Sequence, residues 1–97
     1  MNIAIITGAS SGLGREFALQ LCHNYAAEID EIWLLARRKE PLLTLAQEIS
    51  ATGICVGAAM PMDITDKEQM KDFQDKLEIE MPTVKYLINA AGFAKIG

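Results

Sequence analysis

Three glycines stand close together near the start of the sequence, between an apolar run and an amphipathic one. They lie in the stretch TGASSGLG, at Gly8, Gly12 and Gly14. The preceding run, Ile3 to Ile6, is short, apolar and rich in β-branched residues, which indicates a strand buried on both faces of a parallel sheet. After the glycines, apolar residues recur at helical spacing, at Leu13, Phe17 and Leu21. The chain therefore opens with a strand, a glycine-rich turn and a helix.

The alternation of strand and helix continues along the chain. Three further apolar runs of strand length are present, at 31–36, 54–59 and 84–88. Pro41 suits the first turn of a second helix, and Gly53 suits its end. The apolar stripe of that helix is Leu42, Leu45 and Ile49. Thr65 followed by Glu68 has the form of a capping box and predicts a third helix. The inward face of the third helix is predicted to carry Met70, Phe73 and Leu77.

Four strands separated by three helices indicate a parallel sheet with helical crossovers. Right-handed crossovers favour an α/β, Rossmann-like doubly wound sheet, which is partial here, with the strand order 3-2-1-4. Residues 1–97 are expected to form a single domain. In this order the connections of strands 1 and 4 leave toward opposite sides. The carboxyl ends of these two strands then mark the switch point where ligands bind.

Composition excludes several other classes. The formal net charge is -4, and the nine lysine and arginine residues form no long basic run, so we expect no nucleic acid partner. No apolar stretch has the length of a membrane span or a signal-peptide core, which leads to the interpretation of a cytoplasmic protein without a membrane partner. Cys22 and Cys55 lack metal-binding spacing and are predicted to be reduced and buried. His23 is given no role, and no metal site is expected.

The glycine-rich turn has the chemistry of a phosphate site. It leaves strand 1 at its carboxyl end and opens a helix, so free backbone N–H groups and the positive end of the helix dipole can meet a pyrophosphate. Ser10 and Ser11 add hydroxyl groups in the same loop. Glycines also occur in such turns for packing reasons alone, and that alternative stays open at this point. A P-loop is excluded, because no Gly-Lys-Ser/Thr sequence follows.

The glycine spacing resembles a known family signature. TGASSGLG matches the TGxxxGxG pattern of the short-chain dehydrogenases/reductases of the classical type, and two further matches follow in order. These are Asp63 after strand 3 and Asn89-Ala90-Ala91-Gly92 after strand 4. The resemblance covers the whole chain but only the amino-terminal, cofactor-binding part of the family's fold. It assigns the loop residues Gly8, Ser10, Ser11, Gly12, Leu13 and Gly14 to cofactor binding.

The resemblance also bears on which nicotinamide cofactor is bound. In the family, an acidic residue just after strand 2 accepts hydrogen bonds from the ribose 2′-OH, whereas an arginine attracts a 2′-phosphate. Arg37 and Arg38 occupy that place, which favours NADP(H) over NAD(H). Glu31 stands at the amino end of strand 2, away from the ligand edge. The alternative for the two arginines is pairing with surface carboxylates.

The two later motifs imply further cofactor contacts. By resemblance, Asp63 and Ile64 line an adenine pocket, although Asp63 could also start a turn. The segment Asn89 to Gly92 resembles the family's NNAG, with Ala90 in place of the second asparagine. That replacement removes one polar contact. Gly92, by the same resemblance, leaves space beside the ribose and nicotinamide.

The family's catalytic pattern is absent from these 97 residues. The reaction is hydride transfer between nicotinamide and a carbonyl or alcohol carbon, with a Tyr-x-x-x-Lys pair supplying the proton. Tyr25 is followed four residues later by Ile29, and Tyr86 by Ala90, so no catalytic residue is assigned. We expect the cofactor-binding part of a longer NADP(H)-dependent oxidoreductase, inactive alone, whose complete form acts on a small carbonyl or alcohol. The alternatives are a free-standing, non-catalytic NADP(H)-binding module, or a unit that forms homo-oligomers through strand 4.

Overall fold

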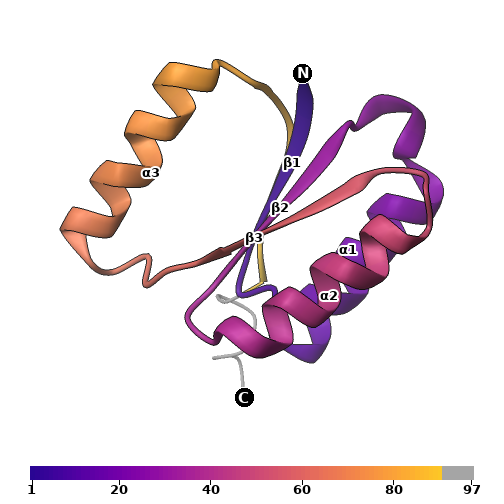
Figure 1. Ribbon diagram of the computed structural model, residues 1–97, viewed down its shortest axis with the longest axis horizontal. Coiled ribbons are helices and arrows are strands. Elements are labelled where there is room, and N and C mark those ends of the chain that lie inside the picture. The colour runs from indigo at the N-terminus through magenta and orange to yellow at the C-terminus, as the bar shows by residue number, and fades with distance from the viewer. Residues whose placement is uncertain (91–97) are drawn as a thin grey trace.

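The computed structural model describes residues 1–90, which form one parallel sheet with helices on both sides (Figure 1). The strands are β1 Asn2–Thr7, β2 Glu31–Ala36, β3 Val56–Pro61 and β4 Thr83–Asn89. The helices are α1 Gly12–Asn24, α2 Lys39–Ala51, α3 Lys67–Glu80 and the short 3-10 helix η1 Ala26–Glu28. Within residues 1–90, no helix has both the length and the apolar character needed to cross a membrane.

The sheet has the predicted strand order, β3-β2-β1-β4, and every pair is parallel. β1 lies inside the sheet, where Ile5 pairs with Trp33 of β2 on one side and with Leu87 of β4 on the other. All four carboxyl ends therefore meet at one edge. The expectation of a doubly wound α/β sheet is confirmed.

Alternate residues of β1 build two separate apolar layers, as the period of two in a strand requires. Ala4 and Ile6 belong to the core beneath α1 and α2, while Ile3 and Ile5 belong to a smaller core on the opposite face. Figure 1 shows α1 and α2 together on one side of the sheet and α3 alone on the other. Both faces of β1 are thus covered, which explains its uninterrupted apolar sequence.

Two local predictions about the helices are wrong. Of the predicted apolar stripe of α1, Leu21 is buried and Phe17 packs against the core, but Leu13 is 44% exposed. Gly14, Ala18 and Cys22 complete the buried face. The N-cap of α3 is Asp66 rather than Thr65, and its carboxylate accepts hydrogen bonds from the N–H groups of Glu68 and Gln69. A carboxylate at this position also interacts favourably with the helix dipole, which a threonine hydroxyl does not do.

The third strand begins two residues later than predicted. β3 spans Val56–Pro61 rather than 54–59, and Ile54 lies in the preceding turn with 52% of its surface exposed. The start of the strand follows from its register, because the Val56 N–H donates to the Asp30 carbonyl oxygen. The end of α2 at Ala51, just before Gly53, agrees with the prediction.

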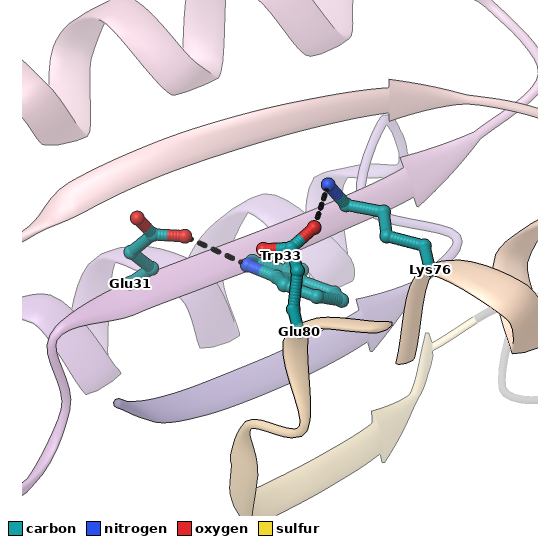
Figure 2. Close-up of polar contacts among 4 residues, drawn as sticks. All are labelled: Glu31, Trp33, Lys76 and Glu80. Atoms are coloured by element: carbon teal, nitrogen blue, oxygen red, sulfur yellow. Dashed lines mark hydrogen bonds and ion pairs between the residues drawn. The ribbon is translucent and has the colours of Figure 1, made fainter. Parts of the chain in front are cut away.

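α3 is attached to the sheet through Trp33, which is fully buried on β2. The ring of Phe73 meets the indole edge-on, with ring centroids 5.9 Å apart. Lys76 Nζ lies 5.2 Å from the indole centroid, which is a cation–π distance. Figure 2 shows how polar groups frame this contact: Trp33 Nε1 donates to Glu31 Oε1 over 2.9 Å, and Lys76 pairs with Glu80. Trp33 is therefore a central contact of α3 with the smaller core, against which Phe73 and Leu77 both pack.

Replacing Phe73 with alanine is expected to loosen α3. Because Phe73 is half-buried, the loss of stability should be about 2 kcal/mol, below the cost at a fully buried site. Trp33 is the chain's single tryptophan, so its fluorescence emission should move to longer wavelength as water reaches the indole. Denaturant unfolding followed by fluorescence measures both effects.

Ile79→Ala provides the matched control on the same helix. Ile79 is 81% exposed, so its truncation should change stability by less than about 0.5 kcal/mol and leave the emission unchanged. Equal effects of the two substitutions would contradict the assigned anchoring role of Phe73.

Candidate functional site

The carboxyl edge of the sheet carries a pocket of about 500 Å³. It lies between the loops that follow β1, β2 and β3, at the edge where the switch point was predicted. The pocket unites seven of the predicted site residues: Gly8, Ser10, Ser11, Arg37, Arg38, Asp63 and Ile64. Met62 and Thr65 also line it and were not predicted as site residues. Thr65 was missed because its spacing to Glu68 pointed to a helix cap.

The loop after β1 is held in shape by its own backbone and by Ser11. Gly8 has a φ of 69°, in the left-handed region that glycine adopts without strain. Ser11 Oγ donates to the Gly8 carbonyl oxygen over 2.8 Å and accepts from the Gly14 N–H over 3.0 Å. The sequence suggested a hydroxyl donor for a ligand here. In this structure the Ser11 hydroxyl instead caps α1 and closes the loop.

Two glycines of the loop differ in how closely the fold surrounds them. A Cβ on Gly14 would lie 2.3 Å from the Gly8 carbonyl oxygen and 2.8 Å from the Ala9 Cα, so the fold itself excludes a side chain there. A Cβ on Gly12 would meet nothing within 4 Å. Packing therefore accounts for Gly14, whereas no contact within residues 1–90 accounts for Gly12. The space above Gly12, at the start of α1, is therefore open.

Alanine substitutions at these two glycines should have different effects on stability. Gly14→Ala is expected to destabilise the protein by about 3 kcal/mol or more, because backbone atoms must move to admit the Cβ. Gly12→Ala should leave stability unchanged or raise it by up to about 1 kcal/mol, since alanine is the better helix former. Thermal unfolding of both variants measures this difference. Similar melting temperatures for the two would contradict the assignment.

The end of β2 presents two arginines to the pocket. Arg37 and Arg38 are exposed, and neither has an ion-pair partner within residues 1–90. Arg15 differs, because it pairs with Glu48 and joins α1 to α2. Arg38 is also the N-cap residue of α2 but provides no side-chain cap, so the first N–H groups of that helix lack this partner. Two cations and a helix amino terminus make this a place suited to an anion.

Asp63 is held by the residue two positions later. Its Oδ1 accepts from the Thr65 hydroxyl over 2.6 Å and from the Thr65 N–H over 2.9 Å. These two hydrogen bonds, with a smaller contribution from the charge of Arg37, hold the pKa of the Asp63 carboxyl below its ordinary value. Asp63 therefore forms the turn that the sequence offered as an alternative, and it still lines the pocket.

The lowered pKa of Asp63 is expected to depend on the Thr65 hydroxyl. In Thr65→Val, the backbone N–H remains but the stronger hydrogen bond is lost, so the carboxyl pKa should rise toward its ordinary value. With a depressed pKa, the stabilising contribution is present above the unfolded-state pKa and is lost as the pH falls through the folded-state pKa. Valine should therefore weaken this acid dependence of stability. Carboxyl NMR titration measures the shift, and an unchanged midpoint would contradict it.

The end of β4 lies beside the end of β1. The Thr7 hydroxyl donates to Asn89 Oδ1 over 2.7 Å, and Ala90 is fully buried. Gly12, Leu13 and Gly14 open α1 next to the pocket but are not among the residues that line it. Ala91 and Gly92 lie outside the described residues. The structure thus gathers the segments that follow β1, β2 and β3 around one pocket, and the end of β4 is hydrogen-bonded to the end of β1 without lining the pocket.

The model of the short chain dehydrogenase family matches residues 2–97. A short chain dehydrogenase of Pseudocercospora fijiensis is 38% identical over 96 residues, covering 97% of this chain and 29% of its own length. The crystal structure of a betaketoacyl-[ACP] reductase from Bacteroides thetaiotaomicron superposes with a TM-score of 0.76 at 32% identity, covering 93% and 39% of the two chains.

A third similar protein was solved with a nucleotide. It is a metagenomic short-chain oxidoreductase in complex with NADP, with a TM-score of 0.71 at 25% identity, covering 89% of this chain and 37% of that one. The fold is thus that of a Rossmann-like dehydrogenase domain. The chain belongs to the short-chain dehydrogenase family, whose members use nicotinamide cofactors and act on small molecules. It spans about a third of the length of the relatives named here.

Proposed function

We propose that this chain binds NADP(H) as the cofactor-binding part of a short-chain oxidoreductase that transfers hydride to or from a small carbonyl or alcohol. One observation carries the proposal: a single pocket unites the glycine loop at the start of α1 with two arginines that lack ion-pair partners within residues 1–90. The pyrophosphate would lie over Gly12, where backbone N–H groups and the helix dipole favour negative charge.

The preference for NADP(H) over NAD(H) rests on the end of β2. Arg37 and Arg38 can donate charge-assisted hydrogen bonds to a 2′-phosphate, and the uncapped start of α2 adds a favourable dipole. No carboxylate occupies this place to accept from a ribose 2′-OH. Glu31, the acidic residue of β2, lies at the opposite edge and accepts from the Trp33 indole. The NADP bound to the similar metagenomic enzyme supports the same choice.

The wall formed by the β3 loop suits an adenine ring. Asp63 and Ile64 both line the pocket, and only Oδ1 of Asp63 is used by Thr65. Oδ2 accepts no hydrogen bond within residues 1–90, so it is available to an exocyclic amino group. Ile64 is 38% exposed and supplies an apolar surface beside it. Base contacts from β3 and phosphate contacts from β1 and β2 would orient the cofactor along the sheet edge.

These 97 residues contain no Tyr-x-x-x-Lys pair, so the proposal assigns the chain binding but no proton transfer. By itself it is expected to be inactive. The second candidate is a free-standing, non-catalytic NADP(H)-binding module. It is favoured by the pocket that residues 1–90 already form. Submicromolar binding of NADPH by the isolated chain would support the module. Binding only when the chain is part of a longer reductase would support the oxidoreductase.

Calorimetric titration with NADPH and NADH tests the cofactor preference. Each of Arg37→Ala and Arg38→Ala should weaken NADPH binding by about 10- to 100-fold, the loss of a charge-assisted hydrogen bond, and leave NADH binding nearly unchanged. Lys71→Ala is the control, because it removes an equal charge from the exposed surface of α3. Equal losses for both cofactors would contradict a role at the 2′-phosphate.

A further inference from the structure

Both cysteines of the chain lie together at the edge of the sheet opposite the pocket. Cys22 is in the last turn of α1 and Cys55 directly precedes β3, 33 residues further along the chain. Their Sγ atoms are 3.3 Å apart, and both residues are buried and carry free thiols. Because helices run antiparallel to the strands they cross, the end of α1 returns to the amino edge where β3 begins. The doubly wound topology therefore creates this pair.

A directed chain of hydrogen bonds orients the two thiols. The Thr52 hydroxyl donates to the Ile49 carbonyl oxygen over 2.6 Å, so its one proton is already used. At the 3.5 Å contact between Thr52 and Cys22, the Cys22 S–H must therefore be the donor. Cys55 S–H in turn donates to Cys22 Sγ. Cys22 Sγ thus lies between Thr52 Oγ1 and Cys55 Sγ, and the Cys55 thiol is directed at Cys22.

We propose that Cys22 and Cys55 are a modification site at which a small disulfide oxidant, of the oxidised-glutathione class, closes an intramolecular disulfide. The sulfurs need to approach from 3.3 Å to the bond length of about 2.05 Å, a change of roughly one ångström. Residues 52–54, which lead into Cys55, are exposed, so a shift of this turn would displace no other buried side chain.

The exchange proceeds in two balanced steps. The Cys22 thiolate attacks one sulfur of the oxidant, which forms a mixed disulfide and releases one small thiol. The Cys55 thiolate then attacks Cys22 Sγ and releases the second small thiol. Two protein S–H bonds are broken and one S–S bond is formed, while the oxidant gains two electrons and two protons.

Burial sets the rate of this chemistry. Desolvation, reinforced by the hydrogen bond to Cys22, raises the pKa of Cys55 to about 12. The thiolate of Cys55 is therefore scarce at neutral pH. Because Cys22 is also fully buried, the first step needs a local opening of the fold, and both steps are slow while the fold is closed. The position of the equilibrium, rather than the rate, is the quantity to measure.

The bridge would constrain the chain strongly. It would enclose β2 and α2 between its two ends and join the last turn of α1 to the start of β3. A loop of this length in the unfolded state loses much of its entropy when it is closed. By thermodynamic linkage, the equilibrium constant for disulfide formation is larger in the folded state than in the unfolded state. The factor is the same as the one by which the disulfide raises the equilibrium constant for folding.

The experiment equilibrates the protein in buffers of reduced and oxidised glutathione, with and without 6 M guanidinium. Intact mass after acid quenching reports the bridged species, which is lighter by two hydrogens. The equilibrium constant for bridge formation should be at least about 100-fold larger in native buffer than in guanidinium. The bridged protein should melt about 10 °C higher than the reduced one. An equal or smaller native constant would overturn the proposal, as would oxidation only to dimers joined between chains.

Cys55→Ser and Cys22→Ser serve as matched controls, since serine keeps the side-chain size nearly constant. Neither variant should lose two hydrogens, and each should show at most one glutathione adduct. A two-hydrogen loss in either would overturn the assignment. The readouts are mass and melting temperature, so they are independent of cofactor binding. If the protein failed to bind NADPH, the disulfide could still be tested in this way. If no disulfide formed, the proposed NADP(H) pocket would be unaffected.

Discussion

The close approach of α1 to the end of β1 is the constraint on which the remaining structure depends. Gly14 lies against the Gly8 carbonyl oxygen, at a distance that leaves no room for a Cβ. Because the helix can begin so close to the strand, its axis lies along the sheet and buries Ala18 and Cys22. The same contact holds the amino terminus of α1 at the carboxyl edge, next to the ends of β2 and β3. The pocket follows from this placement.

Charge and polarity are distributed unequally between the two edges of the sheet. The carboxyl edge has Arg37, Arg38 and the amino termini of α1 and α2, all of which favour an anion. The amino edge has the two thiols and the indole hydrogen bond from Trp33 to Glu31. Parallel strands make this separation possible, because every strand ends at one edge and begins at the other. The proposed ligand site and the proposed disulfide therefore lie at opposite ends of the same elements.

Most of the architecture could be predicted from the sequence, since it depends on periodicity and on the handedness of crossovers. The all-apolar run of β1 indicated a strand covered on both faces, and the structure places Ile3 and Ile6 in two different cores. The sequence also predicted that Arg37 and Asp63 lie near each other, because they follow strands whose carboxyl ends must share one edge, and both line the pocket. The errors were local. Thr65 and Asp66 both suit a helix cap, and the pairing of Thr65 with Asp63 decides between them.

The sequence by itself determined the parallel order of the strands, the edge that carries the pocket and the positive charge at the end of β2. These features follow from spacing along the chain and from the chemistry of single residues. Only the tertiary structure decided that Ser11 closes its own loop, that Leu13 faces solvent and that packing excludes a side chain at Gly14 but not at Gly12. It also decided that Cys22 and Cys55 meet. Each of these depends on the distance between atoms far apart in sequence or on the direction of one hydrogen bond, which a pattern of residue types does not contain.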